Sequence, residues 1–374
     1  MGQKSPVKIL YIAPENNAGT LELWQAAHRS LGNEARFVTL FSTKYEHAED
    51  INLNLPLVPT EKWLANVRHL FYKTHGEAAE YEVQSGYPPT WRPHNLLESF
   101  FFRFRDLLWT PKVTRAIEKY DLLDYDIYHL EWGHGFFRSG KIVQKLRAMG
   151  KHIICTYHGT DIRNRGVIPA IDQVAEVNFT SELDLLHLHP RMEYVFLPYN
   201  TRQFNPSIDL NSPVRLCHAT TNRFFKGSNI IIDVCERIAR EREDAEFVLI
   251  ENRPHEEALI MKARSDIYID QISNTGGWGY GMNSVESLSM GICSCTNLIP
   301  EYEEFIPDHP FVNVNADTLD AQLNSLLDHP EIIRQKGSEG KTWVEKHHDI
   351  SNVIKEVYKI YQREGWISSL PWDE

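Results

Sequence analysis

The stretch SNTGGWGYGMNSVESLSMGICSC, residues 273–295, places four glycines ahead of a helical pattern, and a short apolar strand pattern follows the helix. A glycine-rich turn at a helix start leaves backbone N–H groups without partners, and the positive end of the helix dipole points the same way. Such a turn is suited to an anion such as a phosphate. The order of loop, helix and strand also predicts one step of an α/β fold.

Apolar runs bounded by turn residues alternate with helical patterns along almost the whole chain. Continuous apolar runs separated by helices predict parallel sheets that are covered on both faces. We predict strands within residues 8–14, 35–41, 126–132, 151–158 and 175–181 of the first half, and within 214–220, 245–251, 266–273 and 292–297 of the second. The predicted fold class is therefore α/β, with two Rossmann-like domains that are each a doubly wound parallel sheet.

The boundary between the domains is predicted in LPYNTRQFNPSIDLNSP, residues 197–213, where three prolines and a cluster of Asn, Asp and Ser interrupt the pattern. We expect an N-terminal domain over residues 1–200, a C-terminal domain over 201–349 and a final helix within 350–374. Two such domains facing a central cleft would bind ligands at the carboxyl ends of their strands.

Residues 61–109 are less regular and rich in aromatic residues and arginine. We predict helices that pack on the first sheet, with a membrane- or acceptor-binding surface as the alternative.

The composition restricts the classes of partner. The chain of 374 residues has a net charge of -12, which argues against a general nucleic-acid binder. Residues 1–200 hold 22 Lys and Arg against 23 Asp and Glu, and the remaining residues hold 17 against 28. An anionic surface would therefore meet the first half more readily.

The N-terminus lacks the pattern of a signal peptide, and no uncharged run approaches the length of a membrane span. The five cysteines form no C-x-x-C pair, and we predict Cys293 and Cys295 to be reduced core residues on one face of a strand. We expect a cytoplasmic location, with peripheral contact at the inner face of a membrane through the N-terminal domain left open.

Two cations, Arg223 and Lys226, stand in RFFKG at the predicted entrance to the first helix of the second domain. This position suits a diphosphate, because lysine supplies a compact positive charge and the arginine guanidinium can donate two parallel hydrogen bonds. A dinucleotide site is a weaker interpretation of GYGMNS, because Ser284 occupies its third small position. The motif also follows the third predicted strand of its domain and not the first.

The sequence resembles the retaining glycosyltransferases of family 4, which have the GT-B type of two-domain fold and use nucleotide-sugar donors. The resemblance covers nearly the whole chain and is best in the second half. Lys226-Gly227 is similar to the KG of that family, and Gly279-Tyr280-Gly281 with Glu286 is similar to its glycine, aromatic, glycine and second glutamate. Trp278 stands where the family has its first glutamate. Residues 220–222 stand where the family has an arginine, which Arg223 would replace.

The resemblance implies an acceptor-binding N-terminal domain, a nucleotide-sugar-binding C-terminal domain and a final helix, within residues 350–374, that crosses back to the first domain. It also implies a role for each matching residue. The amides of Met282 and Asn283 would hold the distal phosphate, and Glu286 would accept hydrogen bonds from the ribose hydroxyls. Because the first glutamate usually contacts the donor sugar, amides of the glycine loop would replace that contact. The predicted donor-binding residues are Gly19, Thr275, Gly276, Gly277, Gly281, Met282, Asn283 and Glu286.

In the first half, His158 lies at the end of the predicted strand 151–158 and resembles a family histidine that contacts the donor sugar. The predicted catalytic residues are His158, Arg223 and Lys226. Gly19 would let donor phosphate and acceptor approach the backbone at a helix start. The predicted acceptor-binding residues, for which a turn or capping role is the alternative, are Glu15, Asn16, Glu131, His134 and Asp161.

HLEWGH, residues 129–134, contains metal-ligand residue types, but the P-C-x-x-C partner of the zinc deaminases is missing from the sequence. No DxD pair is placed to carry a divalent ion to a diphosphate. We therefore expect no metal and no cofactor beyond the nucleotide-diphosphate-sugar co-substrate. Lys226, Arg223 and helix dipoles would stabilise the leaving group.

These features predict a metal-independent, retaining hexosyltransferase that takes part in polysaccharide or glycoconjugate biosynthesis. Its acceptor would be a carbohydrate, free or linked to lipid or protein. One alternative is a nucleotide-sugar epimerase of the same architecture, with an acid/base pair drawn from His134, His158 and Asp161. A second is a non-catalytic carbohydrate-binding subunit, which the missing first glutamate at Trp278 suggests. The base, the sugar and the oligomeric state stay open.

Overall fold

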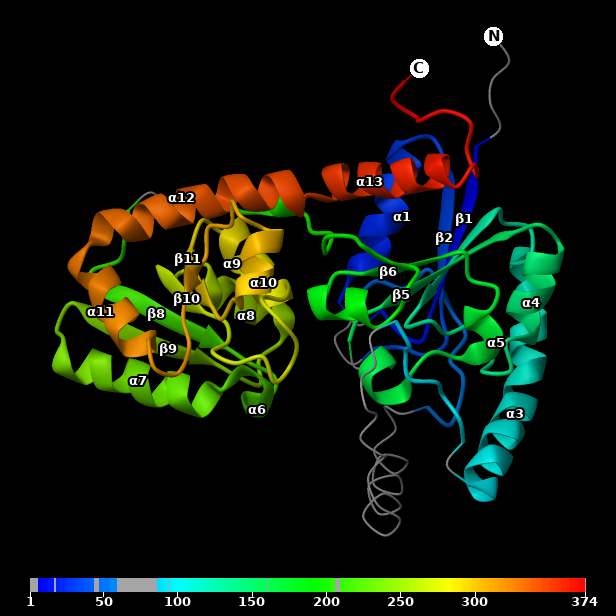
Figure 1. The fold of residues 1–374 in the computed structure, drawn as a ribbon, viewed down its shortest axis with the longest axis horizontal. Coiled ribbons are helices and arrows are strands. Elements are labelled where there is room, and N and C mark those ends of the chain that lie inside the picture. Colours follow the sequence, from blue (N-terminus) through cyan, green and yellow to red (C-terminus); the bar gives the residue numbers. More distant parts are fainter. Residues whose placement is uncertain are drawn as a thin grey trace. The chain divides into compact units, whose positions relative to one another are not determined.

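The computed structural model describes residues 6–16, 18–43, 47–58, 86–93, 95–159, 161–205 and 209–373. The chain divides into two compact units (Figure 1). Unit 1 comprises Met1–Val195 together with Ile354–Glu374, and unit 2 comprises Phe196–Val353. Each unit contains one sheet whose neighbouring strands are parallel, with helices in the connections.

Unit 1 has a seven-stranded sheet of order β3-β2-β1-β4-β5-β6-β7. Its strands are β1 (Lys8–Ala13), β2 (Glu34–Thr39), β3 (Ile51–Asn52), β4 (Ile127–Glu131), β5 (His152–Tyr157), β6 (Val177–Thr180) and β7 (Met192–Tyr194). Its helices are α1 (Thr20–Ser30), α3 (Leu96–Tyr120), α4 (Lys141–Ala148), α5 (Pro169–Asp172) and, from Ile354 onward, α13 (Ile350–Arg363), with short helical turns η1 (Asp161–Arg165) and η2 (Leu183–His187). The strand order reverses between β1 and β4, which is the point where doubly wound sheets bind ligands.

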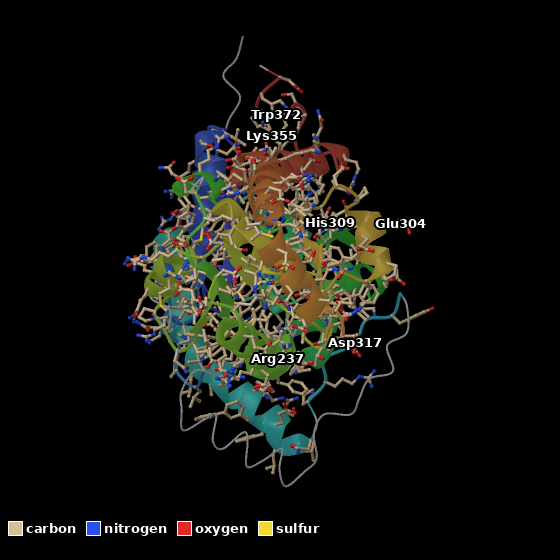
Figure 2. The ribbon with its side chains drawn as sticks, turned by 90° about the vertical axis from the view of Figure 1, so that its left-hand side faces the viewer. Arg237, Glu304, His309, Asp317, Lys355 and Trp372 are labelled. Carbon is tan, nitrogen blue, oxygen red and sulfur yellow. The ribbon has the colours of Figure 1, made fainter. Side chains whose placement is uncertain are left out.

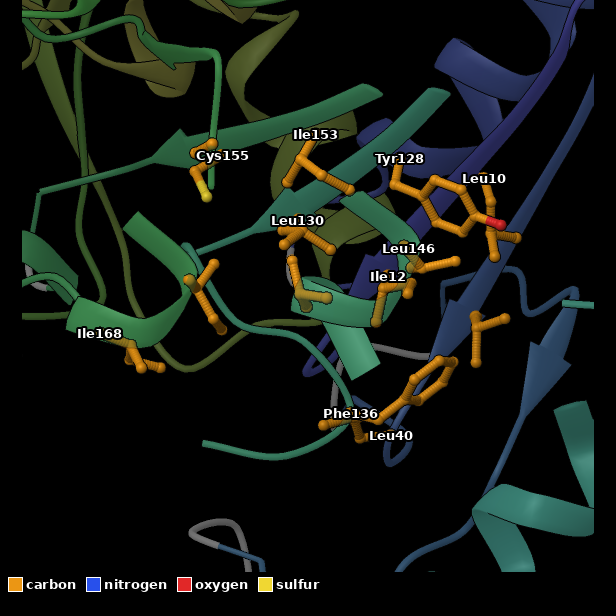
Figure 3. Packing of buried hydrophobic residues seen from close by; sticks show 14 of the residues in the cluster. Leu10, Ile12, Leu40, Tyr128, Leu130, Phe136, Leu146, Ile153, Cys155 and Ile168 are labelled. Carbon is orange, nitrogen blue, oxygen red and sulfur yellow. The ribbon is translucent and has the colours of Figure 1, made fainter. Parts of the chain in front are cut away.

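Alternating residues of the central strands of unit 1 bury both faces of the sheet. Leu10, Ile12, Tyr128 and Leu130 face one apolar cluster, which includes residues of α3 and α4 (Figure 3). A wholly apolar face of this kind is what period-2 alternation produces in a buried parallel strand.

The opposite face of this sheet carries Tyr11 and His129, whose rings stack with centroids 4.3 Å apart. The C-terminal helix α13 closes this face, because Tyr358 lies 3.0 Å from His28 of α1 and Tyr361 lies 2.5 Å from His129. Trp372, labelled with Lys355 in Figure 2, packs edge-on against Tyr358. The last residues of the chain are thus part of unit 1.

Unit 2 has a five-stranded sheet of order β12-β11-β10-β8-β9. Its strands are β8 (Val214–Ala219), β9 (Ala245–Ile250), β10 (Ile267–Ile269), β11 (Cys293–Thr296) and β12 (Val312–Asn313). Its helices are α6 (Arg223–Lys226), α7 (Ser228–Glu241), α8 (His255–Lys262), α9 (Met282–Ser289), α10 (Pro300–Phe305), α11 (Leu319–Asp328) and α12 (Pro330–His347), with the short turn η3 (Thr201–Gln203). The order reverses between β8 and β10, so their carboxyl ends define the switch point of this sheet.

All nine strands predicted from apolar runs are present, and the predicted core role of Cys293 and Cys295 is confirmed because both are buried in an apolar cluster of unit 2. Three further strands, β3, β7 and β12, have only two or three residues, which is too short for a periodic signal. The prediction for residues 61–109 lies partly outside the described residues. Its described part includes the start of α3, where Trp109 lies in the same apolar cluster as strands of the first sheet. Among the described helices, none combines the length and the apolar composition that a membrane crossing requires.

Close helix contacts in unit 2 hold α9 in place behind the glycine loop. Gly337 of α12 lies against the carbonyl oxygen of Gly291, and Gly340 lies against Leu288 of α9. A side chain at Gly337 would overlap that carbonyl. The glycines of α12 are therefore required by packing, although glycine is a poor helix former.

We predict that Gly337→Ala destabilises the protein by about 1–3 kcal/mol, because overpacking outweighs the gain of about 1 kcal/mol in helix propensity. Urea unfolding measures the change, and Ser338→Ala on the exposed face of the same helix is the control. A Gly337→Ala protein more stable than the wild type would contradict this packing.

Candidate functional site

The switch point of unit 2 is formed by the turns that follow β8 and β10. The turn after β8 leads through the Asn222 cap into α6, and the segment after β10 is the glycine-rich stretch that ends at α9. Lys226 lies in the first of these two segments, and Glu286 lies in α9, just beyond the second segment. The fold brings these two segments together at the carboxyl edge of one sheet, where such folds bind ligands.

Lys226 forms an ion pair with Asp270, the first residue after β10. The Asp270 side chain is fully buried, and it also accepts hydrogen bonds from the Ser284 hydroxyl at 2.6 Å and the Gly281 amide at 3.4 Å. Burial would raise the pKa of Asp270, but the charge and hydrogen bond of Lys226 outweigh it and lower this pKa below its ordinary value. A single carboxylate therefore ties α6 to the glycine loop and to α9.

The glycine loop lies against α6. A side chain at Gly276 would approach the Cβ of Phe225 to 3.0 Å, and Gly277 has a φ of +131°, which favours glycine. The Gly277 amide donates to the carbonyl of Asn274, while its own carbonyl accepts from the Gln271 side chain. Thr275 and Gly276 are exposed, and Trp278 is half-buried. Thus Gly276 meets the helix that carries Lys226.

Helix α9 begins with open backbone donors. The first amide that donates within the helix is that of Ser284, which bonds the carbonyl of Gly281. The amides of Met282 and Asn283 precede it and have no acceptor in the helix. Together with the helix dipole, these two N–H groups can bind an anion at the switch point.

Glu286 is buried and engaged by two residues of α8. Lys262 donates to its Oε2 at 2.5 Å, and His255 Nε2 lies 2.9 Å from its Oε1. Burial would raise the pKa of Glu286, but the positive charge of Lys262 and the hydrogen bond from His255 lower it. Lys262 also donates to the Asn283 side chain at 2.7 Å. The buried ammonium thus positions both the carboxylate and the start of α9.

Arg223 lies at the start of α6, where its guanidinium makes two hydrogen bonds to the carboxylate of Glu251, at 2.7 and 2.6 Å. Its side chain is 48% exposed. This pair leaves further N–H donors of Arg223 open to solvent on the same turn.

In unit 1 the structure brings His158 and Glu131 together at the carboxyl ends of β5 and β4. His158 Nε2 lies 2.7 Å from Glu131 Oε2, and the His158 side chain is 36% exposed. Burial lowers the pKa of His158, but the hydrogen bond and charge of Glu131 raise it more, to about 9. At neutral pH this histidine is therefore a cation paired with a carboxylate.

Asp161 and His134 lie next to this pair in the chain but are engaged by the backbone. Asp161 accepts hydrogen bonds from the amides of His158 and Ile162, so its carboxylate caps the turn. His134 Nδ1 lies 2.5 Å from the carbonyl oxygen of Gly135. Burial and three neighbouring arginine charges lower the pKa of His134 well below its ordinary value, so the ring is neutral.

The residues after β1 lie at the other side of the switch point of unit 1. Gly19 caps α1 in the left-handed region with a φ of +65°, and a side chain there would approach the His47 ring to 2.9 Å. Asn16 is buried and donates to Glu22 and to the carbonyl of Ala48. Glu15 precedes it on the same turn and is half-buried.

Asp270, Lys262 and His255 are residues that motif reasoning missed. Asp270 directly follows an apolar strand, and a lone acid at the carboxyl end of a parallel strand was the available signal. Lys262 lies in an ordinary helical pattern, so no local signal marks it. Among the described residues, no group of three or more potential metal ligands is brought together.

No known protein-family model and no curated protein matches the chain. Solved structures with a similar fold include sucrose-phosphate synthase from Thermosynechococcus elongatus, with 14% sequence identity, 97% of this chain and 100% of that chain covered, and a TM-score of 0.58.

A second is an alpha-glucosyltransferase in complex with UDP and DNA, with 9% identity, 96% and 100% covered and a TM-score of 0.59. A third is a putative UDP-N-acetylglucosamine 2-epimerase from Listeria monocytogenes, with 12% identity, 97% and 98% covered and a TM-score of 0.53. The chain therefore has the two-sheet α/β architecture of the GT-B fold, and the predicted fold class is confirmed.

We predict that Glu131→Gln lowers the pKa of His158 from about 9 toward or below 6.5, because the hydrogen-bonded charge is lost while burial remains. NMR titration of the His158 ring measures this shift. Since the pKa is raised in the folded state, the pair stabilises the protein fully below pH 6.5 and loses this effect as pH rises through 9. An unchanged midpoint in Glu131→Gln would contradict the pairing.

Lys262→Met is expected to destabilise the protein by about 3–5 kcal/mol, because it leaves the buried carboxylate of Glu286 without its cation. The double variant Lys262→Met with Glu286→Met should be less destabilised than Lys262→Met alone. Urea unfolding of the single and double variants measures both effects. Wild-type stability of Lys262→Met would show that the ion pair is absent in solution.

Proposed function

We propose that the protein is a glycosyltransferase that moves a sugar from a nucleoside diphosphate sugar to an acceptor. The observation that carries the proposal is the switch point of unit 2, where Lys226, the open amides of Met282 and Asn283, and the Glu286 carboxylate gather. Lys226 and the two amides suit a diphosphate, and the Glu286 carboxylate suits the hydroxyls of a ribose. The similarity in fold to an alpha-glucosyltransferase solved with UDP supports a nucleotide donor.

The donor is proposed to bind with its distal phosphate at the start of α9. Lys226 uses one of its three donor directions for Asp270, so two remain for phosphate oxygens. Arg223 would add charge from the exposed side of the same turn. Negative charge that develops on the departing diphosphate would then be stabilised by amides and side-chain cations, without a metal ion in the proposed mechanism.

Glu286 is proposed to accept hydrogen bonds from the ribose hydroxyls. Its Oε2 is held by the buried Lys262, whereas its Oε1 is contacted by the partly exposed His255. A ribose can therefore compete with His255 for Oε1 while Lys262 keeps the carboxylate in position. Thr275, Gly276 and Gly277 would contact the sugar in place of the glutamate that Trp278 replaces.

The acceptor is proposed to bind unit 1, where the charged His158–Glu131 pair lies at the carboxyl ends of β5 and β4. We propose membership of the family 4 class and retention of configuration, with His158 contacting the donor sugar and Gly19 allowing close approach to the backbone. Asn16 and Glu15 would contact the acceptor from the turn after β1. Asp161 and His134 would act by shaping this edge, since backbone groups engage both.

A nucleotide-sugar epimerase is the second candidate, because His158 and Glu131 form an acid/base pair at the end of two parallel strands. The similarity to a putative UDP-N-acetylglucosamine 2-epimerase agrees with it. Incubation of the protein with a nucleotide sugar in the absence of acceptor distinguishes the epimerase from the glycosyltransferase. Formation of an epimeric nucleotide sugar would reject the transferase in favour of this candidate.

The donor site is tested by Met282→Pro, which deletes one proposed phosphate donor, the amide at the first position of α9. Proline is favoured at this helix position, and Gly281 before it is already extended with φ -130° and ψ -166°. UDP binding measured by calorimetry should weaken about tenfold or more, since a hydrogen bond to a charged group contributes about 1.5–3 kcal/mol.

Met282→Ala is the matched control, because it removes the side chain but keeps the amide. A thermal-shift screen with uridine, guanosine and adenosine diphosphate sugars first identifies the base, since a ligand that binds the folded state raises its stability. Equal UDP affinity in Met282→Pro and Met282→Ala would reject this phosphate position. No shift with any of the three donors would reject the proposed function.

A further inference from the structure

Three arginines of unit 1 lie near His134, which follows strand β4. Arg105 lies in α3, Arg138 in the loop between β4 and α4, and Arg165 at the end of η1. Their charges all act on His134 and lower its pKa. Contacts link the segments as well, because Val167, two residues after Arg165, accepts a hydrogen bond from the Trp91 amide at 2.8 Å, and the Arg138 guanidinium lies over the Trp91 ring. The three cations therefore come from neighbouring segments of one unit.

Aromatic rings fix two of these guanidinium groups. The Arg138 guanidinium carbon lies 4.9 Å from the centre of the Trp91 ring and 4.2 Å from that of Phe102. Arg105 contacts the same Phe102 ring at 4.8 Å and Trp109 at 4.0 Å. The shared Phe102 ring therefore places Arg105 and Arg138 side by side. Contacts with aromatic rings orient the two guanidinium planes.

The hydrogen-bond donors of this cluster are incompletely used. Arg105 is 5% exposed, yet its Nε has no hydrogen-bond partner, and the same holds for the buried Nε of Arg138. Within the described parts of the chain, Arg138 makes no hydrogen bond at all through its guanidinium. Buried donors without partners are costly, and a bound acceptor group would satisfy them.

The positive charge is also incompletely balanced. Arg105 pairs with Asp106 at 3.1 Å, but Arg165 donates to the backbone carbonyls of Trp132 and Gly166. Burial, followed by the charges of Arg105 and Arg165, lowers the pKa of Arg138 to about 9, although Glu98 and Asp106 act in the opposite direction. Asp161 likewise acts on the charge of Arg165. Among the described residues, however, no carboxylate lies at ion-pair distance from Arg138 or Arg165, so two of the three guanidinium groups can still pair with an anion.

We propose that Arg105, Arg138 and Arg165 form an anion-binding site that takes a phosphate group of the acceptor. A phosphate monoester carries close to two negative charges at neutral pH, whereas a carboxylate carries one, so the dianion matches the cluster better. The site follows β4, on the same edge of unit 1 as Glu131. Its assignment to the acceptor rests on the proposed glycosyl transfer, whereas phosphate binding itself does not.

Calorimetric titration of the full chain with inorganic phosphate, in saturating UDP to occupy the donor site, tests this proposal. Phosphate should bind the wild type, and Arg138→Gln or Arg165→Gln should weaken binding by about tenfold to a hundredfold. Arg103→Gln, an exposed arginine on the same helix as Arg105, is the matched control and should bind normally. Acetate, a monoanion, should bind more weakly than phosphate.

The variants also separate a binding role from a structural one. Because Arg138 is repelled by two like charges, Arg138→Gln should keep or raise the melting temperature while losing phosphate. Glucose 6-phosphate and decyl phosphate then identify the source, since tighter binding of the first indicates a soluble sugar phosphate and of the second a lipid phosphate. In either case, Arg138→Gln must weaken the binding of the phosphate ester.

Absence of phosphate binding by the wild type would overturn the proposal, as would equal affinity in wild type, Arg138→Gln and Arg165→Gln. Equal binding of acetate and phosphate would overturn the assignment to a dianion. UDP affinity is measured on the same samples and should be unchanged by Arg138→Gln. Failure of UDP binding with intact phosphate binding would reject the proposed function but keep the anion site.

Discussion

The buried carboxylate of Asp270 is the interaction on which the organisation of unit 2 depends. It pairs with Lys226 of α6, accepts the Ser284 hydroxyl of α9 and approaches the amide of Gly281. An isolated charge at this depth would be costly, so its three partners are held to it. Two turns that are more than forty residues apart in sequence are thereby fixed at one sheet edge. The open amides of α9 gain a defined position relative to the lysine.

The same logic recurs at Glu286, where a buried lysine and a partly exposed histidine hold one carboxylate from two sides. The arrangement separates a fixed partner from an exchangeable one. Lys262 lies within the core and positions the carboxylate, while His255 faces solvent and can give way to a hydroxyl. In unit 1, the His158–Glu131 pair and the arginine cluster provide a second charged edge with different chemistry. His158 and Arg105 have carboxylate partners there, whereas Arg138 stacks on aromatic rings and Arg165 donates to backbone carbonyls.

The fold could be predicted from sequence because the strands of buried parallel sheets are continuous apolar runs, such as those at β1, β5 and β8. Lys226, Gly281 and Glu286 could be placed because their motif is local and resembles a known family. Their partners could not, since Asp270, His255 and Lys262 act through distances set by the fold and not by spacing in the chain. Arg138 and Arg105 likewise look like ordinary surface arginines until Phe102 brings them together. Local patterns thus predict the elements, whereas long-range electrostatic partners require the structure.

The central claim is that the switch point of unit 2 binds a nucleoside diphosphate. Hydrogen–deuterium exchange of the full chain with and without UDP tests it directly, because amides that acquire a ligand partner exchange more slowly. Protection concentrated in residues 270–286, with a smaller effect around Lys226, is the predicted result. Unchanged exchange across that segment, or protection confined to unit 1, would contradict the account.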